Sequence, residues 1–374
     1  MQYVIIDHLF AANLRKKIIM GKRLILFGFL TIVLNYAFGQ SVSQNIKVIV
    51  ITTDGLRWEE VFKGLDTSIL KYKSYQKGDS TSTASNFGGL TNEERRKKLM
   101  PFLWSIIAEK GEIHGNRTKG SNVDNANPYW FSYPGYSEIL TGQVDTAINS
   151  NDYKPNPNTN FFEYLNTLPF YKNKVAAFGA WDAFKRILNE KRAGFLVSNG
   201  NQMDSSLLKD PQMKLLSNIM AETYQPFGKD ETLDVFTKFQ AMHYLKTKKP
   251  NALYVSMGET DELAHAGNYP EYLKAINRFD ELLKEIYDFV NTDLDYKGKT
   301  VILITTDHGR GDINKMQWTS HGSKINDSHQ IWYAMIGAGV VHLGEVSSNE
   351  QVYQKELIHK VAKLINVNFN SMKY

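Results

Sequence analysis

The sequence predicts an α/β fold built on a largely parallel sheet with helices on both faces. Two observations predict it: five short, β-branched and apolar runs that suit buried strands, and helical patterns that separate these runs. Strands that alternate with helices along a chain form a doubly wound sheet whose connecting helices cover both faces. The expected strands span residues 46–53, 175–181, 252–258, 300–306 and 331–337.

Two stretches carry clear helical signals. Thr91 and Glu94 form a capping box at the start of a helical stretch over residues 91–110, which is interrupted or restarted at Pro101. Between residues 272 and 290, apolar side chains recur at the three- and four-residue spacing of one helix face. The alternation of such stretches with the expected strands supports the two-sided fold.

A single domain with surface insertions is predicted for residues 45–370. Residues 73–90 are rich in Ser, Thr and Gly, which is typical of a surface insertion. Residues 198–232 lack clear periodicity and are expected to form a cap over the functional site. No internal repeat and no extended linker is evident in the sequence, so one domain with insertions is preferred to two domains.

Residues 1–39 are predicted to be an export signal. Lys22 and Arg23 precede an apolar run over residues 24–34, and small residues follow at positions suited to a signal peptidase. Met20 stands where such a signal begins, so it is an alternative start. An uncleaved membrane anchor is the second interpretation, although the run is short for a bilayer span. We therefore expect a secreted or periplasmic protein without stable membrane insertion after cleavage.

The composition argues against several classes of protein and site. Of the formal net charge of +5, a surplus of four lies in residues 1–39, which hold five basic residues and one acid. The remainder has a charge of +1 and shows no basic stripe, so we expect no nucleic-acid-binding surface. Cysteine is absent, which excludes disulfides, thiolate metal ligands and lipid attachment through cysteine.

Acidic residues and a histidine follow three of the expected strands. Asp54 comes directly after the first strand, Asp261 follows the third, and Asp307 and His308 follow the fourth. In an open α/β sheet, ligands collect outside the carboxyl ends of the strands, so these side chains are expected to meet there. Each one alone is a common turn or capping residue. Their joint occurrence favours a metal site.

Two further histidines extend this set. Asp261 and His265 are four residues apart, which on a helical turn places both side chains on one face, where they can chelate one ion. Asp307 and His308 are adjacent, and on a regular strand their side chains would point to opposite faces. They can converge on one ion or bind neighbouring ions only if the chain leaves the strand at this point. With His321 and Asp54, these residues form the mixed oxygen and nitrogen set that suits two zinc ions.

Ser132 is the candidate nucleophile. Pro134 is well placed in the first turn of a helix that runs to Thr141, so Ser132 is expected to be its N-cap. A serine at a helix N-terminus presents its hydroxyl where backbone N–H groups favour a phosphoryl group. A serine hydroxyl is a weak nucleophile at neutral pH, and no general-base motif lies near it in the sequence. Coordination to zinc is therefore expected to activate it.

In content and order, these motifs resemble those of the alkaline phosphatase superfamily, most closely its branch of phosphodiesterases and nucleotide pyrophosphatases. The resemblance covers the chain from about residue 48 to residue 339 in five motifs. The matching residues are, in order, Asp54; Ser132 with Tyr133, Pro134, Thr141 and Gly142; Asp261 with His265; Asp307, His308 and Gly309; and His321 with Gly322.

The resemblance implies a three-layer αβα core, two zinc ions and a hydrolase that acts on phosphoric esters. The mechanism it implies is double displacement, in which Ser132 attacks phosphorus and water then hydrolyses the phosphoseryl intermediate. The implied partner is a small-molecule phosphoester. The implied ligands are Asp261, His265 and His321 for one zinc, and Asp54, Ser132, Asp307 and His308 for the other.

Some positions depart from the pattern of this branch. After the proline, the branch has Asn-His where this chain has Gly135 and Tyr136, so its choice among monoesters, diesters and pyrophosphates does not transfer. The branch also uses an Asn beyond the nucleophile to bind a phosphate oxygen, and Asn151 is preferred here to Asn149. Basic residues beside the motifs are candidates to neutralise further substrate charge, chiefly Arg310, with Arg57 and Lys324.

Three alternative functions are compatible with this sequence. A sulfatase shares the fold, but it needs an Arg where Tyr136 stands and a metal-binding Asp where Gly55 stands, and three histidines favour zinc over calcium. A secreted binding protein would keep the fold and the metals without turnover. A phosphotransferase or mutase on the same core would need an acceptor other than water.

Overall fold

The computed structural model describes residues 45–77 and 80–374. Residues 45–374 group into one compact unit. The predicted export signal at residues 1–39, with the alternative start at Met20, lies outside the described residues. No helix in the described part of the chain is both long and apolar enough to cross a bilayer.

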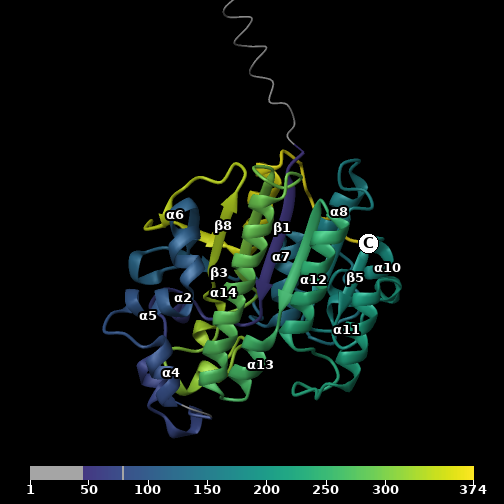
Figure 1. The fold of residues 1–374 in the computed structure, drawn as a ribbon. Helices are drawn as coiled ribbons and strands as arrows, with labels where there is room; N and C mark the ends of the chain where they lie inside the picture. Colours follow the sequence, from purple (N-terminus) through teal and green to yellow (C-terminus); the bar gives the residue numbers. More distant parts are fainter. Residues whose placement is uncertain (1–44, 78–79) are drawn as a thin grey trace, which may run out of the picture. The chain divides into compact units, whose positions relative to one another are not determined.

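The core is an eight-stranded, largely parallel sheet, as the sequence predicts. Its strand order is β5-β4-β6-β1-β7-β8-β2-β9, and all neighbouring pairs from β5 to β7 are parallel (Figure 1). β8 runs antiparallel to both of its neighbours, and β2 and β9 pair in parallel at the edge. The strands are β1 (Lys47–Thr53), β2 (Gly111–His114), β4 (Val175–Gly179), β5 (Leu196–Asn199), β6 (Ala252–Met257), β7 (Thr300–Thr306), β8 (Tyr333–Gly337) and β9 (Gly344–Glu345). A separate two-stranded sheet pairs β3 (Asn122–Asp124) with β10 (Gln351–Tyr353).

Each central strand supplies side chains to two separate apolar cores, because successive residues of a strand point to opposite faces of the sheet. In β1, Ile49 and Ile51 belong to one core, whereas Val48 and Val50 belong to the other. Both faces of the sheet are therefore buried. This explains why the sequence of the strand is almost wholly apolar rather than alternating between apolar and polar residues.

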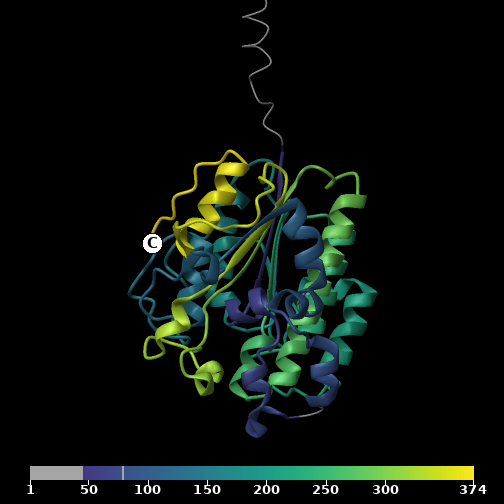
Figure 2. The ribbon, with the colours of Figure 1, turned by 90° about the vertical axis from the view of Figure 1, so that its left-hand side faces the viewer.

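Helices cover both faces of the sheet and complete three layers. Figure 2 shows the sheet nearly edge-on, with α14 and α15 on opposite sides. One core includes side chains of α2 (Trp58–Lys63), α5 (Asn92–Leu99), α12 (Asp234–Lys248) and α14 (Tyr269–Thr292). The other includes side chains of α7 (Ser132–Thr141), α8 (Phe161–Thr167), α9 (Phe184–Ile187) and α15 (Leu357–Leu364). The other helical elements are α3 (Thr67–Leu70), α4 (Ser80–Phe87), α6 (Ala108–Lys110), α10 (Glu190–Ala193), α11 (Pro211–Glu222), α13 (Glu259–His265), η1 (Lys73–Tyr75), η2 (Leu103–Ile107), η3 (Arg117–Lys119), η4 (Ser205–Lys209), η5 (Lys315–Thr319), η6 (Asn326–His329) and η7 (Gln354–Glu356).

The helical signals read from the sequence are confirmed. Thr91 and Glu94 form both hydrogen bonds of the capping box at the start of α5. The helical stretch breaks before Pro101, as predicted, and restarts as a π-type turn, η2, followed by α6. The apolar periodicity between residues 272 and 290 corresponds to one face of α14.

Two segments are more regular than the sequence indicated. Residues 73–90, expected to be an irregular insertion, contain η1 and α4, although most of the described side chains there are exposed. Residues 198–232 contain η4 and α11, which begins at Pro211 under an Asp210 cap. In α11 only Met213 and Met220 are buried, so its sequence carries little of the periodicity that identifies a helix.

The restart of the helix after Pro101 is fixed by a buried carboxyl group on α14. Asp280 accepts hydrogen bonds from the backbone N–H groups of Phe102 at 2.7 Å and Leu103 at 2.8 Å. Burial raises the pKa of Asp280 from its ordinary value to about 7, against the opposing effect of these two hydrogen bonds. The folded protein therefore retains a proton at pH values where the unfolded chain has released it.

This raised pKa predicts how stability depends on pH. The contribution of Asp280 to the free energy of unfolding is fully present below the ordinary carboxyl pKa of about 4. This contribution is lost as pH rises through about 7. We expect Asp280→Asn to flatten the fall in unfolding free energy over this interval, as measured by urea unfolding at several pH values. Asp288→Asn, at an exposed position of the same helix, is the matched control. An unchanged slope in Asp280→Asn would contradict the assignment.

Candidate active site

The carboxyl edge of the sheet brings together the acidic residues that follow β1, β6 and β7. β1 lies between the other two strands, and Thr53 at its end is in register with both Met257 and Thr306. The residues that leave these three strands are therefore neighbours in space. Asp54 and Asp307 follow their strands immediately, and Asp261 lies in the first turn of α13, just beyond β6.

A first cluster surrounds the imidazole of His308. Its Nε2 atom lies 3.2 Å from Asp54 Oδ1, 3.4 Å from Asp307 Oδ2 and 3.4 Å from Ser132 Oγ. The other ring nitrogen, Nδ1, lies 2.9 Å from the carbonyl oxygen of Gly309 and donates a hydrogen bond to it. In the neutral imidazole this contact makes Nε2 the unprotonated nitrogen, and Nε2 is directed at the cluster, which is the arrangement of a metal-binding histidine. The side chains of Asp307 and His308 are fully buried.

A second cluster adjoins the first and is more open to solvent. His265 Nε2 lies 3.1 Å from Asp261 Oδ2 and 3.0 Å from His321 Nε2, and His321 Nε2 lies 3.8 Å from Asp261 Oδ1. The His308 and His321 rings stack with their centroids 4.0 Å apart, so the two clusters are in direct contact through these rings. The His265 side chain is 43% exposed, and this side of the centre therefore offers access from solvent.

Atoms without partners show that the clusters suit metal ions. Among the described residues, Asp54 Oδ1 and Asp307 Oδ2 are buried and accept no hydrogen bond. Burial, followed by the negative charge of Asp261, raises the pKa of Asp54 well above its ordinary value, and burial and the charge of Asp54 do the same for Asp307. Cations placed between these oxygens and His308 Nε2, and between Asp261 and the nitrogens of His265 and His321, would neutralise the charge and use the free lone pairs. The donor set therefore fits metal binding.

Arg310 makes a different contact from the one expected of it. Its guanidinium is buried, forms an ion pair with the Asp261 carboxylate and donates to the Asp261 backbone oxygen at 3.1 Å. Burial raises the pKa of Asp261, but the positive charges of Arg310 and His265 outweigh it and hold that pKa well below the ordinary value. Asp261 is thus kept ionised. A substrate-binding role for Arg310 stays a prediction, and Arg57, also buried, pairs with Glu60.

Ser132 begins α7 but does not cap it, which corrects the expected role of its hydroxyl. The capping position is Phe131, which forms no side-chain cap, and the N–H of Tyr133 is instead bound by Asn151 Oδ1 at 3.0 Å. The N–H of Gly135, which a Ser132 cap would bind, instead donates to the backbone oxygen of Phe131 at 3.0 Å, and the hydroxyl of Ser132 faces His308. The chain reaches this point through Trp130, whose φ of +54° is unfavourable for a bulky residue and marks a strained turn.

Gly135 and Tyr136, the two residues after Pro134 that depart from the pattern of the phosphodiesterase branch, have structural reasons. A Cβ atom on Gly135 would lie 2.4 Å from the backbone oxygen of Asp307, so α7 approaches the end of β7 closely only because this residue is glycine. Tyr136 donates from its hydroxyl to Asp54 Oδ2 at 3.1 Å and is fully buried. Tyr136 was not predicted from the sequence as a partner of the cluster. Its spacing of four residues from Ser132, which places both on one helix face, was the available signal.

Glu231 is a second residue that the sequence analysis missed. Its carboxyl group is buried against Gly258, and its Oε1 atom has no hydrogen-bond partner among the described residues. Burial, followed by the charges of Glu262 and Asp54, raises its pKa well above the ordinary value. Glu231 lies in the segment expected to cover the site, but no motif around it indicated a role.

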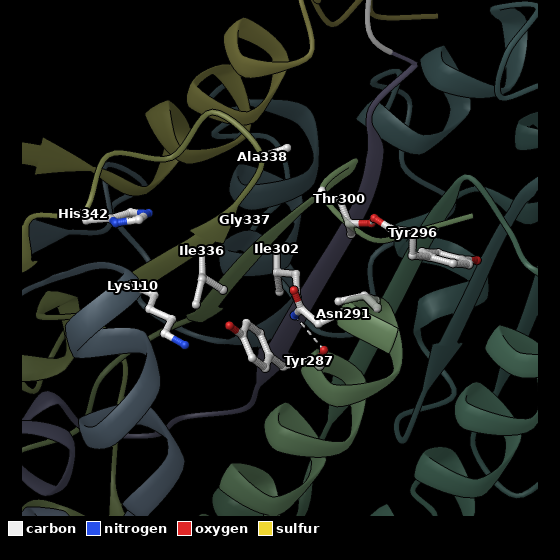
Figure 3. Close-up of a pocket in the computed structure, with 12 residues that line it drawn as sticks. Lys110, Tyr287, Asn291, Tyr296, Thr300, Ile302, Ile336, Gly337, Ala338 and His342 are labelled. Carbon is white, nitrogen blue, oxygen red and sulfur yellow. Dashed lines mark hydrogen bonds between the residues drawn. The ribbon is translucent and has the colours of Figure 1, made fainter. Parts of the chain in front are cut away.

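A cavity of about 270 Å³ at the opposite edge of the sheet is unrelated to this centre (Figure 3). It lies where β7 begins and β8 ends, between the end of α14 and the segment after β8. Lys110 and His342 lie at its rim, whereas Ile302 and Ile336 form part of its apolar wall. Its lining includes no carboxylate, so it lacks the ligands of a metal centre.

A comparison with protein families gives a match to this chain. Residues 218–328 match the family model of the Metalloenzyme superfamily, and this segment contains the predicted ligands from Asp261 to His321. A comparison with curated proteins finds no match.

Among solved structures, alkaline phosphatase PafA is 9% identical, with a TM-score of 0.52 over 87% of this chain and 97% of that chain. An inactive variant of murine ectonucleotide pyrophosphatase/phosphodiesterase 5, in complex with AMP, is 11% identical, with a TM-score of 0.53 over 87% and 96% of the two chains. Ps i-CgsB in complex with k-i-k-neocarrahexaose is 16% identical, with a TM-score of 0.50 over 87% and 73%. At these identities the likeness concerns the fold, and it confirms the expected three-layer α/β architecture.

Proposed function

From the premise that the chain has the fold of the alkaline phosphatase superfamily and matches the metalloenzyme family over residues 218–328, we propose that it is an exported, two-zinc phosphoester hydrolase with Ser132 as its nucleophile. The proposed zinc ligands are those that the resemblance implies. The first ion is assigned to Asp261, His265 and His321, and the second to Asp54, Ser132, Asp307 and His308.

One observation carries this proposal. Asp54, Asp307 and His308 form a fully buried three-residue group at the carboxyl ends of β1 and β7. Ser132 Oγ lies beside this group, at 3.4 Å from His308 Nε2. Asp54 and Asp307 in that group present oxygen atoms without partners. A hydroxyl group held against such a set is suited to nucleophilic attack rather than to a structural hydrogen bond.

The residues of the chain have distinct roles in the proposed double displacement. Zinc, when bound, lowers the pKa of a coordinated hydroxyl and stabilises negative charge on a phosphoryl group. Ser132 Oγ forms a bond to phosphorus as the ester P–O bond breaks and the alcohol leaves. Water then hydrolyses the phosphoserine, releasing phosphate and restoring the hydroxyl.

Asn151, Tyr136 and Arg310 hold this geometry through their contacts with neighbouring residues. Asn151 uses Oδ1 to bind the N–H of Tyr133, which leaves its Nδ2 group as a donor for a phosphoryl oxygen. Tyr136 orients Asp54, and Arg310 keeps Asp261 ionised and in place. Fixed donors and ligands of this kind favour the transition state because they need no reorganisation during the reaction.

A direct test is a rate comparison on the zinc-loaded full chain with three substrates that share one leaving group. These are p-nitrophenyl phosphate, bis(p-nitrophenyl) phosphate and p-nitrophenyl sulfate. We expect hydrolysis of one or both phosphoesters and a much slower reaction with the sulfate, because Tyr136 stands where a sulfatase needs an Arg. A preference for the sulfate would replace the proposal with the sulfatase alternative. No turnover of any of the three would favour a metal-binding protein without activity.

A further inference from the structure

A chain of hydrogen bonds between side chains leads from the interior of the sheet to Asp54. The hydroxyl oxygens of Tyr254 and Thr52 are 2.8 Å apart, and Thr52 Oγ1 donates to Ser256 Oγ at 2.9 Å. Ser256 Oγ donates to the hydroxyl of Tyr136 at 3.2 Å, and Tyr136 donates to Asp54 Oδ2 at 3.1 Å. The four hydroxyl-bearing residues, which we call the hydroxyl chain, are fully buried.

The register of the two central strands places three of these hydroxyls on one face of the sheet. Thr52 of β1 is directly opposite Ser256 of β6, and Val50 is opposite Tyr254. Side chains two residues apart along a strand point to the same face. Val50 and Tyr254 pack in the same apolar core as Tyr136 of α7, so this face is the one that α7 covers. The hydroxyl chain is therefore set by the strand register and by one helix.

Thr52 and Ser256 are polar residues on a buried face whose other side chains are largely apolar. A valine would fill the position of Thr52 with nearly the same shape and would bring no polar group into the interior. Burying a hydroxyl costs free energy unless it is hydrogen-bonded, so a hydroxyl adds nothing to the apolar packing here. What distinguishes these two hydroxyls is that their hydrogen bonds lead, through Tyr136, to a candidate metal ligand.

The carboxylate at one end fixes the direction of every hydrogen bond in the hydroxyl chain. An ionised carboxylate has no proton, so Tyr136 must donate its own proton to Asp54. Each hydroxyl has only one proton, so Tyr136 accepts from Ser256, and Ser256 accepts from Thr52. Thr52 has then used its proton, which makes Tyr254 the first donor. Hydrogen bonds that all run in one direction polarise one another, so the last donor in the series is strengthened.

The two carboxylate oxygens of Asp54 consequently have different roles. Oδ2 accepts the hydrogen bond from Tyr136, whereas Oδ1 accepts none among the described residues and lies 3.2 Å from His308 Nε2. With Oδ2 held from behind, Oδ1 is the oxygen directed at the candidate ligand group. Hydrogen-bonding partners of this kind orient metal ligands, and their loss typically costs about 10–100-fold in metal affinity or activity.

We propose that Thr52, Ser256 and Tyr254 are positioning residues for the metal centre, which act through Tyr136 to hold Asp54 with Oδ1 directed at the ion. The proposal rests on the proposed function, because Asp54 is assigned there to the second zinc ion. Since the three residues act through a ligand of the metal, their removal changes metal binding even in the absence of substrate.

Zinc affinity supplies the first measurement, by competition with a chelating dye on the full chain. Asp54→Ala identifies which of the two dissociation constants belongs to this site. We expect Tyr136→Phe to raise that constant about tenfold, and Ser256→Ala to raise it about threefold, as for the loss of one modest hydrogen bond. The double variant Tyr136→Phe/Ser256→Ala should bind zinc as Tyr136→Phe does, because Ser256 acts only through Tyr136.

Ser198→Ala is the matched control for a merely structural hydrogen bond. Ser198 lies near the end of β5, is 1% exposed and donates to Gln240 at 2.7 Å, with no connection to the hydroxyl chain. Its removal should lower the unfolding free energy about as much as Ser256→Ala does and leave zinc affinity unchanged. Unchanged zinc affinity in Ser256→Ala, an equal change in Ser198→Ala, or additive effects in the double variant would overturn the proposal.

NMR of the metal-free protein supplies the second measurement, with tyrosine labelled by carbon-13 at Cζ. The signal of Tyr136 is identified by its absence in Tyr136→Phe. We expect it to shift in Ser256→Ala and, by less, in Thr52→Val, and to stay in place in Ser198→Ala. No shift in Ser256→Ala would overturn the hydroxyl chain. Weaker zinc binding in Ser256→Ala, in a protein whose wild type hydrolyses no phosphoester, would overturn the proposed function and leave the positioning role standing.

Discussion

Ser132→Ala is expected to lower kcat/KM for p-nitrophenyl phosphate on the order of 10³-fold or more, because the variant has no hydroxyl at the point where the phosphoryl group is attacked. The reduction should appear in kcat. The zinc content should fall little, because Asp54, Asp307 and His308 remain. Steady-state kinetics with metal analysis of the same preparations measure both quantities.

Two matched variants make this result specific to the hydroxyl. Ser132→Thr keeps an oxygen at the same position and is expected to retain much of the activity. Ser150→Ala removes a serine hydroxyl from the loop beside Asn151, where it accepts a hydrogen bond from the Asp152 N–H, and should change kcat/KM little. Full activity in Ser132→Ala, or an equal loss in Ser150→Ala, would contradict a nucleophilic role for Ser132.

The second large effect is on stability, which we expect to depend on zinc and on pH together. When a chelator has removed the metal, Asp54 and Asp307 have raised pKa values in the folded chain. Their contribution to the free energy of unfolding is therefore present at low pH and is lost as pH rises above the ordinary carboxyl range. Zinc removes this cost by neutralising both groups. At about 100 times its dissociation constant, it should add about 2.7 kcal/mol to the unfolding free energy.

Asp307→Asn separates this effect from general metal binding. The variant lacks one of the buried charges, so in chelator its unfolding free energy should fall less between about pH 5 and about pH 8, and zinc should stabilise it less at the higher pH. Urea unfolding of the wild type and the variant, with zinc and with chelator, at both pH values gives the eight values needed. Asp288→Asn, on the exposed face of α14, should behave as wild type. An equal stabilisation by zinc in Asp307→Asn and wild type would place the ion elsewhere.

The sequence predicted the central sheet well because its strands are buried on both faces. The runs that became β1, β4, β6, β7 and β8 are apolar at nearly every position, and that pattern is local. β2 and β5 were missed because they are only four residues long, with intermediate exposure at some positions. The helix α11 was missed for the same kind of reason, since two buried residues do not make a periodic pattern.

Four of the candidate ligands, Asp54, Asp261, Asp307 and His308, could be named from sequence because they follow strands, and parallel strands end at one edge. The contacts that these residues make could not be predicted from the sequence. Tyr136 holds Asp54 across a separation of 82 residues, and Arg310 reaches back 49 residues to Asp261. The spacing of residues along the chain carries no information about such pairs. Likewise, Gly135 is explained only by the backbone oxygen of Asp307, which packs against it in the folded protein.

The sequence alone determined the α/β class, the order of the metal-binding motifs and the identity of the candidate nucleophile, because strand burial and the ends of parallel strands leave local patterns. Only the tertiary structure decided that the hydroxyl of Ser132 faces His308 rather than capping its helix, that Arg310 pairs with Asp261, and that the carboxyl group of Glu231 is buried against Gly258. These features depend on which residues distant in the chain pack together, and that is set by the packing of the sheet between its two layers of helices.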